Sequence, residues 1–261
     1  MSPIRSELLI SSSTGEAGFL AHGPTPLWIV RVPAGSPRLV GNLSAGVAAW
    51  SRDRQLLAYT LDRDVNLAKW DGTQSHKLVT IAGQSSDLQF SLDGKQLRLT
   101  ARDSDGSLRL WEVGVNGKGL RSLLPDSFHQ APGECCGKWS ADGRYYFFVT
   151  LHNGRSDIWA IRERSGFFRR GSHDPSAITT GPLAYFSPAP ALVGDRLFVI
   201  GEQQRAQLQR LDPKSQQFVP FLDGISAGEI DFSRDGKWVT YVSYPDYLLW
   251  RSEVTAAKNS S

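Results

Sequence analysis

A pentapeptide near the carboxyl end of the chain has the spacing of a serine nucleophile. Gly224-Ile225-Ser226-Ala227-Gly228 matches the G-x-S-x-G elbow, in which a serine on a sharp strand-to-helix turn attacks an acyl carbon. The sequence Ser-Ala-Gly recurs at 44–46, and each copy begins six positions before an aromatic residue, Trp50 or Phe232. Because the segment recurs in this way, we interpret it as a linker between repeats and predict no catalytic residue and no enzymatic activity.

Two groups of residues have side chains that ligate metal ions in other proteins. The first is the loop Asp103-Ser104-Asp105-Gly106, which lacks the further oxygen ligands and the bidentate glutamate of a calcium loop. A hairpin turn explains this loop better, because Asp-Gly is a strong turn signal. The second group consists of His129, His152, His173, Cys135 and Cys136. Its spacing has neither the C-x-x-C nor the H-x-x-x-H pattern of a zinc site, so we predict no metal and no cofactor.

A basic and aromatic segment, RERSGFFRRGSHD at 162–174, is the candidate interaction loop. Its proposed contact residues are Arg162, Arg164, Phe167, Phe168, Arg169 and Arg170. Arginine and aromatic residues are enriched at binding hot spots, which favours recognition of an acidic peptide or a phosphate group. The alternative is a long connection between outer strands whose phenylalanines pack against the edge of a sheet.

Length and composition restrict the class of protein. The chain has 261 residues, a net charge of +3 and 40% hydrophobic residues, which suits one globular domain. It lacks long Lys/Arg runs, so we expect no direct binding to nucleic acid. No stretch approaches the roughly 18 apolar residues that cross a bilayer, so we expect no membrane contact. We expect a monomer that binds a protein partner or a small ligand.

The cellular compartment is predicted from the amino terminus. The apolar stretch within the first residues, MSPIRSELLISSS, is too short for a secretory signal. This predicts a cytoplasmic protein, or a periplasmic one if a leader has been removed. Cys135 and Cys136 are adjacent, so a disulfide between them would close a small strained ring, and we expect reduced thiols.

A repeated motif indicates the elements that must position these residues. The motif is an aromatic residue, Ser, any residue and Asp, usually followed by Gly and a basic residue. Copies begin at Trp50, Phe90, Trp139 and Phe232, and a degenerate copy, PALVGDRLFVIG, occupies 190–201. A repeat of about 40–45 residues is typical of a four-stranded propeller blade. The aspartate is expected to cap its own turn.

Each copy is followed by an apolar strand, a polar turn and a second strand. We therefore predict an all-β protein, a six-bladed β-propeller of four-stranded antiparallel blades with incomplete terminal blades. The predicted blades of this single domain span 1–43, 44–83, 84–126, 127–181, 182–223 and 224–261. Trp28, Trp111, Trp159 and Trp250 recur at equivalent strand positions. Their recurrence predicts packing between blades.

These residues resemble the WD-repeat-like, TolB-like propeller family. The segment from Cys135 to Ser172, together with ITTGPLAYFSPAP and RLFVIGEQQ, is similar to the propeller region of acidobacterial winged-helix transcriptional regulators. The resemblance implies a sensing or interaction propeller. DNA binding is not implied, because the sequence contains no winged-helix segment.

Three functions are consistent with these observations. The leading hypothesis is a non-enzymatic propeller that binds a protein partner or senses a ligand. The second is the sensory part of a winged-helix regulator that lacks its DNA-binding domain. The third is a propeller hydrolase or lyase that uses polar groups in a central channel, which requires several titratable side chains to converge.

Overall fold

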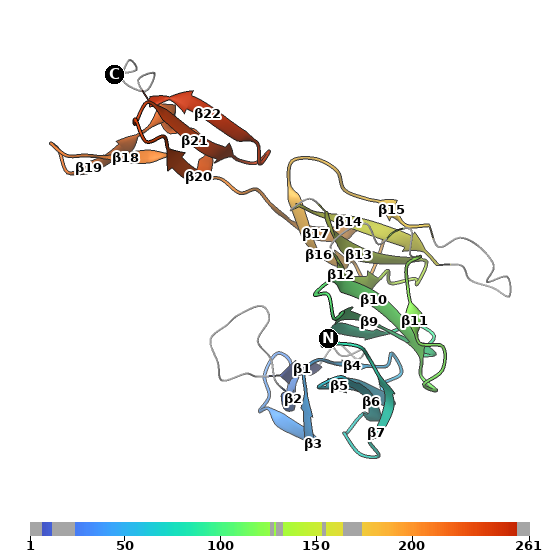
Figure 1. The fold of residues 1–261 in the computed structure, drawn as a ribbon. Helices are drawn as coiled ribbons and strands as arrows, with labels where there is room; N and C mark the ends of the chain where they lie inside the picture. The colour runs from blue at the N-terminus through green and yellow to red at the C-terminus, as the bar shows by residue number, and fades with distance from the viewer. Residues whose placement is uncertain are drawn as a thin grey trace. The chain divides into compact units, whose positions relative to one another are not determined.

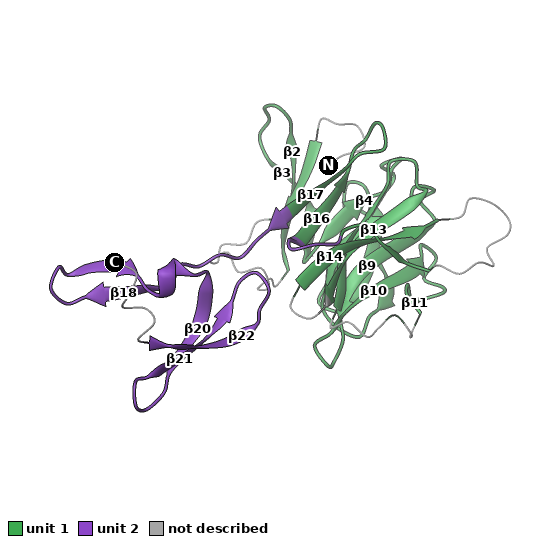
Figure 2. Cartoon of the chain, turned by 90° about the horizontal axis from the view of Figure 1, so that it is seen from above, with its two compact units in different colours: residues 1–179, 185–200 green, residues 180–184, 201–261 purple. Residues whose placement is uncertain are grey.

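The computed structural model describes residues 7–11, 24–125, 128, 133–152, 155–163 and 174–254 (Figure 1). Almost all regular structure in these residues is β-strand, which confirms the all-β prediction. The chain divides into two compact units (Figure 2). Unit 1 contains residues 1–179 and 185–200, and unit 2 contains residues 180–184 and 201–261.

Unit 1 begins with two antiparallel sheets whose strands pair in chain order. The first sheet consists of β1 (Glu7–Ser11), β2 (Thr25–Arg31) and β3 (Arg38–Ala45). The second consists of β4 (Ala48–Trp50), β5 (Leu56–Leu61), β6 (Asp64–Lys69) and β7 (His76–Thr80). From β2 to β7 short connections favour this order, because antiparallel neighbours can be joined by tight hairpins.

The largest sheet of unit 1 combines two antiparallel groups. The first group consists of β8 (Ser85–Phe90), β9 (Gln96–Arg102), β10 (Leu108–Gly114) and β11 (Arg121–Ser122). The second consists of β12 (Gly133–Trp139), β13 (Tyr145–His152), β14 (Arg155–Arg162) and β15 (Ser176–Ala177). A parallel bridge between Leu108 and Gly133 joins the groups. A hairpin of β16 (Ala184–Pro190) and β17 (Leu197–Glu202) follows.

Unit 2 contains a hairpin and a small sheet. The hairpin consists of β18 (Gln209–Asp212) and β19 (Gln217–Pro220). A single turn of 3-10 helix at Leu222–Gly224 leads into the sheet. The sheet consists of β20 (Ala227–Phe232), β21 (Trp238–Ser243) and β22 (Leu249–Glu253).

The predicted set of uniform four-stranded blades is not reproduced by the strand pairing. Within the described residues, the first and last sheets each have three strands, and β16–β17 pairs separately from β18–β19. Residues 203–208, which separate β17 from β18, have no regular structure. The count of six blades and the blade boundaries therefore stay predictions.

The repeated motif forms the same turn at each complete copy. Asp142 Oδ1 accepts hydrogen bonds from the Ser140 hydroxyl at 2.7 Å and the Arg144 N–H at 3.0 Å. Ser140 Oγ accepts one from the Tyr145 N–H at 2.9 Å. The copies that contain Ser51, Ser91 and Ser233 make the same bonds at 2.6–3.1 Å. This confirms that the aspartate caps its own turn.

The core of unit 1 is formed by three buried clusters of strand residues. One cluster includes Ile29 and Leu57, the second Val65 and Leu97, and the third Leu110 and Phe148. Each cluster contains side chains from different strands, so apolar burial holds the strands of unit 1 together. The expected packing role holds for Trp111 and Trp159, which lie against these clusters.

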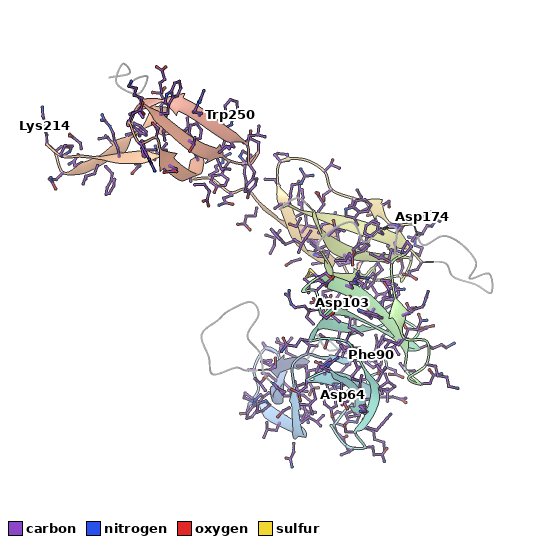
Figure 3. The ribbon with its side chains drawn as sticks, in the orientation of Figure 1. Asp64, Phe90, Asp103, Asp174, Lys214 and Trp250 are labelled. Atoms are coloured by element: carbon purple, nitrogen blue, oxygen red, sulfur yellow. A yellow bond between two sulfur atoms is a disulfide. The ribbon has the colours of Figure 1, made fainter. Side chains whose placement is uncertain are left out.

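The packing prediction is wrong for Trp250, which is labelled on β22 in Figure 3. Its side chain is 49% exposed. The indole N–H donates a hydrogen bond to Ser243 Oγ at 2.9 Å, so this tryptophan packs locally across its own hairpin.

The prediction of reduced thiols is also wrong, because Cys135 and Cys136 form a disulfide. The two residues lie where the register between β12 and β13 shifts, between Cys135 and Lys138. Neighbouring side chains of a regular strand point to opposite faces. A bulge interrupts that alternation, and Cys136 has a left-handed backbone with φ of 64°. The irregular backbone therefore lets adjacent cysteines meet.

Candidate ligand-binding cavity

A cavity of about 610 Å³ lies in unit 1 between the β12–β13 turn and the β16–β17 turn. The first turn and β13 contribute Ser140, Ala141, Asp142, Arg144, Tyr145 and Phe147. The second turn and its strands contribute Pro190, Ala191, Leu192, Gly194, Asp195, Arg196 and Leu197. Ligand pockets of about 300–1,000 Å³ accommodate drug-sized molecules. The cavity is therefore large enough for a small ligand or for a side chain of a partner with its neighbours.

Two aromatic rings of β13 form one wall of the cavity. Tyr145 and Phe147 lie two residues apart and therefore on the same face of the strand. Their rings are stacked, with centroids 6.1 Å apart and planes inclined by 23°. The alternate residues Tyr146 and Phe148 are fully buried on the opposite face. The core thus fixes the strand, while its other face presents half-buried aromatic surface to the cavity.

The β12–β13 turn places a charged pair at the cavity. Asp142 forms an ion pair with Arg144, and Gly143 between them has φ of 72°, a conformation that glycine adopts readily. The Arg144 N–H, the Ser140 hydroxyl and the Arg144 side chain together lower the pKa of Asp142 to about 2. Asp142 therefore stays ionised at physiological pH and is held by its own turn.

Replacing Arg144 with methionine is expected to raise the pKa of Asp142 from about 2 toward its ordinary value of 3.8. The pKa should remain below 3.8, because the Ser140 hydroxyl and the backbone N–H of residue 144 still donate to the carboxylate. Carboxyl carbon NMR across an acid titration measures this change. A pKa that stays at about 2 in Arg144→Met would show that the guanidinium contributes nothing.

The β16–β17 turn is the degenerate copy of the motif. It presents apolar side chains where the other copies have serine and aspartate. The backbone keeps the turn, since the Ala191 N–H donates to the Arg196 carbonyl at 2.9 Å. Ala191 and Val193 occupy the positions of the serine and aspartate, so the side-chain caps are lost. Leu192 is 68% exposed at the cavity. Asp195 and Arg196 add one charge of each sign.

The predicted interaction loop begins beside this cavity. Arg162 is the last residue of β14 and pairs directly with Tyr145 of the cavity wall. Directly opposed residues of antiparallel strands share a face. The other candidate residues, Arg164, Phe167, Phe168, Arg169 and Arg170, lie outside the described residues. The sequence analysis recognised both turns but missed the cavity, because the turns that form it are far apart in the chain.

The G-x-S-x-G match lies in unit 2, in a context unlike a nucleophile elbow. Ser226 follows the 3-10 helix and precedes strand β20, whereas an elbow leads from a strand into a helix. Its hydroxyl oxygen accepts a hydrogen bond from the Ala206 N–H at 3.1 Å. The structure therefore agrees with the interpretation of this motif as a connecting segment.

The acidic loop considered for calcium is a hairpin turn. Asp105 Oδ1 accepts hydrogen bonds from the Ser107 N–H at 2.9 Å and the Ser107 hydroxyl at 2.6 Å. Asp103, labelled in Figure 3, forms an ion pair with Arg109 at 2.9 Å. Both carboxylates thus have partners within the hairpin.

The histidines considered as zinc ligands, His129, His173 and the side chain of His152, lie outside the described residues. Among the residues that are described, no group of three or more potential ligands could hold a metal ion. No helix in the described part of the chain has the length and apolar character needed to cross a bilayer.

Comparison with solved structures identifies the fold. The chain is similar to TolB from Acinetobacter baumannii at 17% identity and a TM-score of 0.53, over 88% of this chain and 57% of that one. The fold is that of a β-propeller, as in that TolB. This propeller spans 57% of the length of that TolB. No protein-family model and no curated protein matches it, so the resemblance to winged-helix regulators gains no support and stays a prediction.

Two further structures correct the prediction that the chain is not an enzyme. The propeller is similar to a puromycin-hydrolyzing peptidase from Mycobacterium tuberculosis at 15% identity and a TM-score of 0.53, over 97% of this chain and 43% of that one. It is also similar to a puromycin hydrolase at 16% identity and a TM-score of 0.50, over 89% and 40% of the two chains. Peptidases share this fold, so the fold gives no ground for excluding enzymatic activity. The prediction of no enzymatic activity is therefore wrong.

Proposed function

We propose that this propeller is a binding module that takes up a protein partner or a small ligand in the cavity between the β12–β13 and β16–β17 turns. The observation that supports the proposal most directly is the cavity itself, with its volume of about 610 Å³. The proposal places the cavity between neighbouring blades of a six-bladed ring. A preformed cavity suits ligand sensing and also the insertion of a side chain from a protein partner.

The lining favours a ligand with an apolar group and a charged group. Tyr145 and Phe147 on one side and Leu192 and Leu197 on the other offer apolar contacts. In most small-molecule sites, a small number of polar groups fixes the orientation of the ligand. Asp142 already accepts hydrogen bonds within its own turn. It is therefore less available to bind a cationic group of a ligand.

Arginines make an anionic group the better match for the charged part of the ligand. Arg144 and Arg196 line the cavity, and Arg162 lies opposite Tyr145. Arg144 pairs with Asp142 through Nε, which leaves the other N–H groups of its guanidinium for a ligand. Guanidinium groups bind carboxylates with two parallel hydrogen bonds. In this proposal the arginines that follow in the sequence, Arg164, Arg169 and Arg170, take part in recognising an acidic peptide or a phosphate group.

Adjacent residues of the β16–β17 turn allow a matched test. Leu192 lines the cavity and is 68% exposed, whereas Val193 is 81% exposed and does not line it. Leu192→Glu is expected to weaken binding at least about tenfold, because a carboxylate replaces apolar contact area and repels the anionic group of the ligand. Val193→Glu should bind as the wild type does. Both substitutions are on the surface, so neither should alter folding.

The measurement uses ligand-observed NMR with phenylacetate, indole-3-acetate and their neutral amides as probes. The proposal predicts saturation transfer from the wild type to the carboxylates, with weaker transfer to the amides. The absence of transfer to every probe would contradict the proposal, and so would equal losses in the two glutamate variants. Arg162→Ala tests whether the start of the loop contributes, since it should weaken the carboxylates more than the amides.

A further inference from the structure

The bulge that carries Cys135 and Cys136 recurs in strands that have no cysteine. In β8 the register shifts between Ser86 and Gln89, and in β20 it shifts between Gly228 and Asp231. A residue with positive φ lies three positions before the repeat's aromatic position in each of these strands. These residues are Asp87 at 55°, Cys136 at 64° and Glu229 at 51°, with Ser187 at 52° in β16. The bulge therefore belongs to the repeat and does not depend on a disulfide.

Contacts that involve no sulfur atom hold the bulge of β12 in place. The Cys136 N–H donates a hydrogen bond to Thr100 Oγ1 at 3.2 Å. The Gly137 carbonyl accepts one from Gln89 Nε2 at 2.8 Å. Gly137 also lies directly against the ring of Tyr146, which is fully buried. All three contacts remain available when the sulfur atoms are not bonded to each other.

The two cysteines are accessible to small thiols. Both are only half-buried, unlike the structural cysteines of protein cores, which are inert because they are enclosed. We propose that Cys135 and Cys136 form a reversible dithiol–disulfide couple, carried by a bulge that keeps its conformation in both redox states. The couple provides a site for thiol–disulfide exchange that is separate from the ligand cavity.

The exchange is a balanced two-electron reaction. A thiolate of a small dithiol attacks one cysteine sulfur and breaks the disulfide, and the other cysteine leaves as a thiolate that takes up a proton. The second thiol of the reductant then attacks the mixed disulfide. The reductant becomes a cyclic disulfide, and the protein gains two electrons and two protons. A small-molecule disulfide such as oxidised glutathione reverses the reaction.

The test treats the full chain under native conditions with dithiothreitol, removes the reductant and labels free thiols with N-ethylmaleimide for mass spectrometry. The untreated protein should take up no label, and the reduced protein should take up one label on each of its two cysteines. Incubation of the reduced protein with oxidised glutathione should abolish labelling. Near-ultraviolet circular dichroism and the thermal unfolding midpoint should be nearly the same in both states.

Two variants separate the couple from a purely structural disulfide. The double variant Cys135→Ser/Cys136→Ser should keep the wild-type near-ultraviolet spectrum, because the repeat forms its bulge without sulfur. Cys136→Asp copies the residue that β8 uses at this position and should also fold, with Cys135 labelled before any reduction. The proposal is overturned if reduction abolishes the near-ultraviolet spectrum, if dithiothreitol acts only on the denatured chain, or if oxidised glutathione fails to restore the disulfide.

Discussion

Replacing Arg98 with methionine is expected to lower the free energy of unfolding by about 3–5 kcal/mol, the usual cost of removing one partner from a buried ion pair. Arg98 is 2% exposed, and so is its partner Glu112. The guanidinium donates to Glu112 at 2.8 Å and to Glu163 at 2.6 Å. Methionine fills a similar volume but carries no charge. Among the described residues, the ion pair with Arg121, at 2.8 Å, is then the only one left to the buried Glu112.

Aromatic rings enclose this network, which makes the loss harder to compensate. The guanidinium carbon of Arg98 lies 4.1 Å from the ring centre of Trp139 and 4.5 Å from that of Tyr146. Cation–π contacts of this kind are strongest where water is excluded. Because Arg98 belongs to β9 and both rings belong to β12 and β13, the network also joins the two groups of strands in the largest sheet.

Urea unfolding followed by tryptophan fluorescence measures the effect. Lys77→Met is the control, since the Lys77–Asp64 pair at 3.5 Å is exposed to 58% and 36% and exposed ion pairs contribute little to stability. The double variant Arg98→Met/Glu112→Met should recover much of the loss, because no buried charge remains unpaired at that position. A loss in Arg98→Met no larger than in Lys77→Met would contradict the prediction.

The cost of Arg98→Met should depend on pH. Burial alone would raise the pKa of Glu112, but Arg98 and Arg121 outweigh it and hold the pKa below the ordinary 4.5. A lowered folded-state pKa stabilises the protein above the unfolded-state value, and that stabilisation is lost as the pH falls through the folded-state value. The difference between wild type and variant should therefore be largest near neutral pH and shrink as the pH falls below 4.5.

Gly137→Ala is expected to destabilise the protein by about 3 kcal/mol, at the upper end of the usual cost of overpacking. A Cβ atom at Gly137 would overlap the hydroxyl and ring atoms of Tyr146. The ring cannot move aside easily, because it is fully buried and packs edge-on against Trp139 with centroids 5.0 Å apart. Either the bulge of β12 or the core must shift.

The control for Gly137→Ala is Gly94→Asn, which tests a side chain where space is open. Gly94 has φ of 69°, and a Cβ atom added there would meet no atom of the described residues within 4 Å. Asparagine adopts left-handed backbone readily, so the cost should stay below about 1 kcal/mol. In Gly137→Ala/Tyr146→Leu, the smaller side chain makes room, and the double variant should lose less than the sum of the two single losses. Additive losses would exclude a direct clash.

Local patterns in the sequence were sufficient to predict the turns. In the motif that contains Ser140 and Asp142, every donor and acceptor of the turn lies within six residues. The Asp105-Gly106 hairpin is equally local. Such hydrogen bonds depend on neighbouring residue types and on glycine's access to positive φ, so the sequence carries the necessary information. The recurrence of these turns was also enough to predict an all-β fold.

The cavity and the buried network depend on contacts between residues far apart in the chain. Arg98 occupies a polar position in an alternating strand, the usual pattern of an exposed residue, yet it is buried against Glu163, which lies 65 residues away. The cavity likewise requires the turn at Asp142 to face the turn at Leu192. Periodicity shows which residues share the face of a strand, but not what covers that face. By itself the sequence determined the repeated turns and the all-β class, whereas contacts between residues far apart in the chain decided which charges are buried and where a cavity remains, and the bulge of β12 decided that the adjacent cysteines meet.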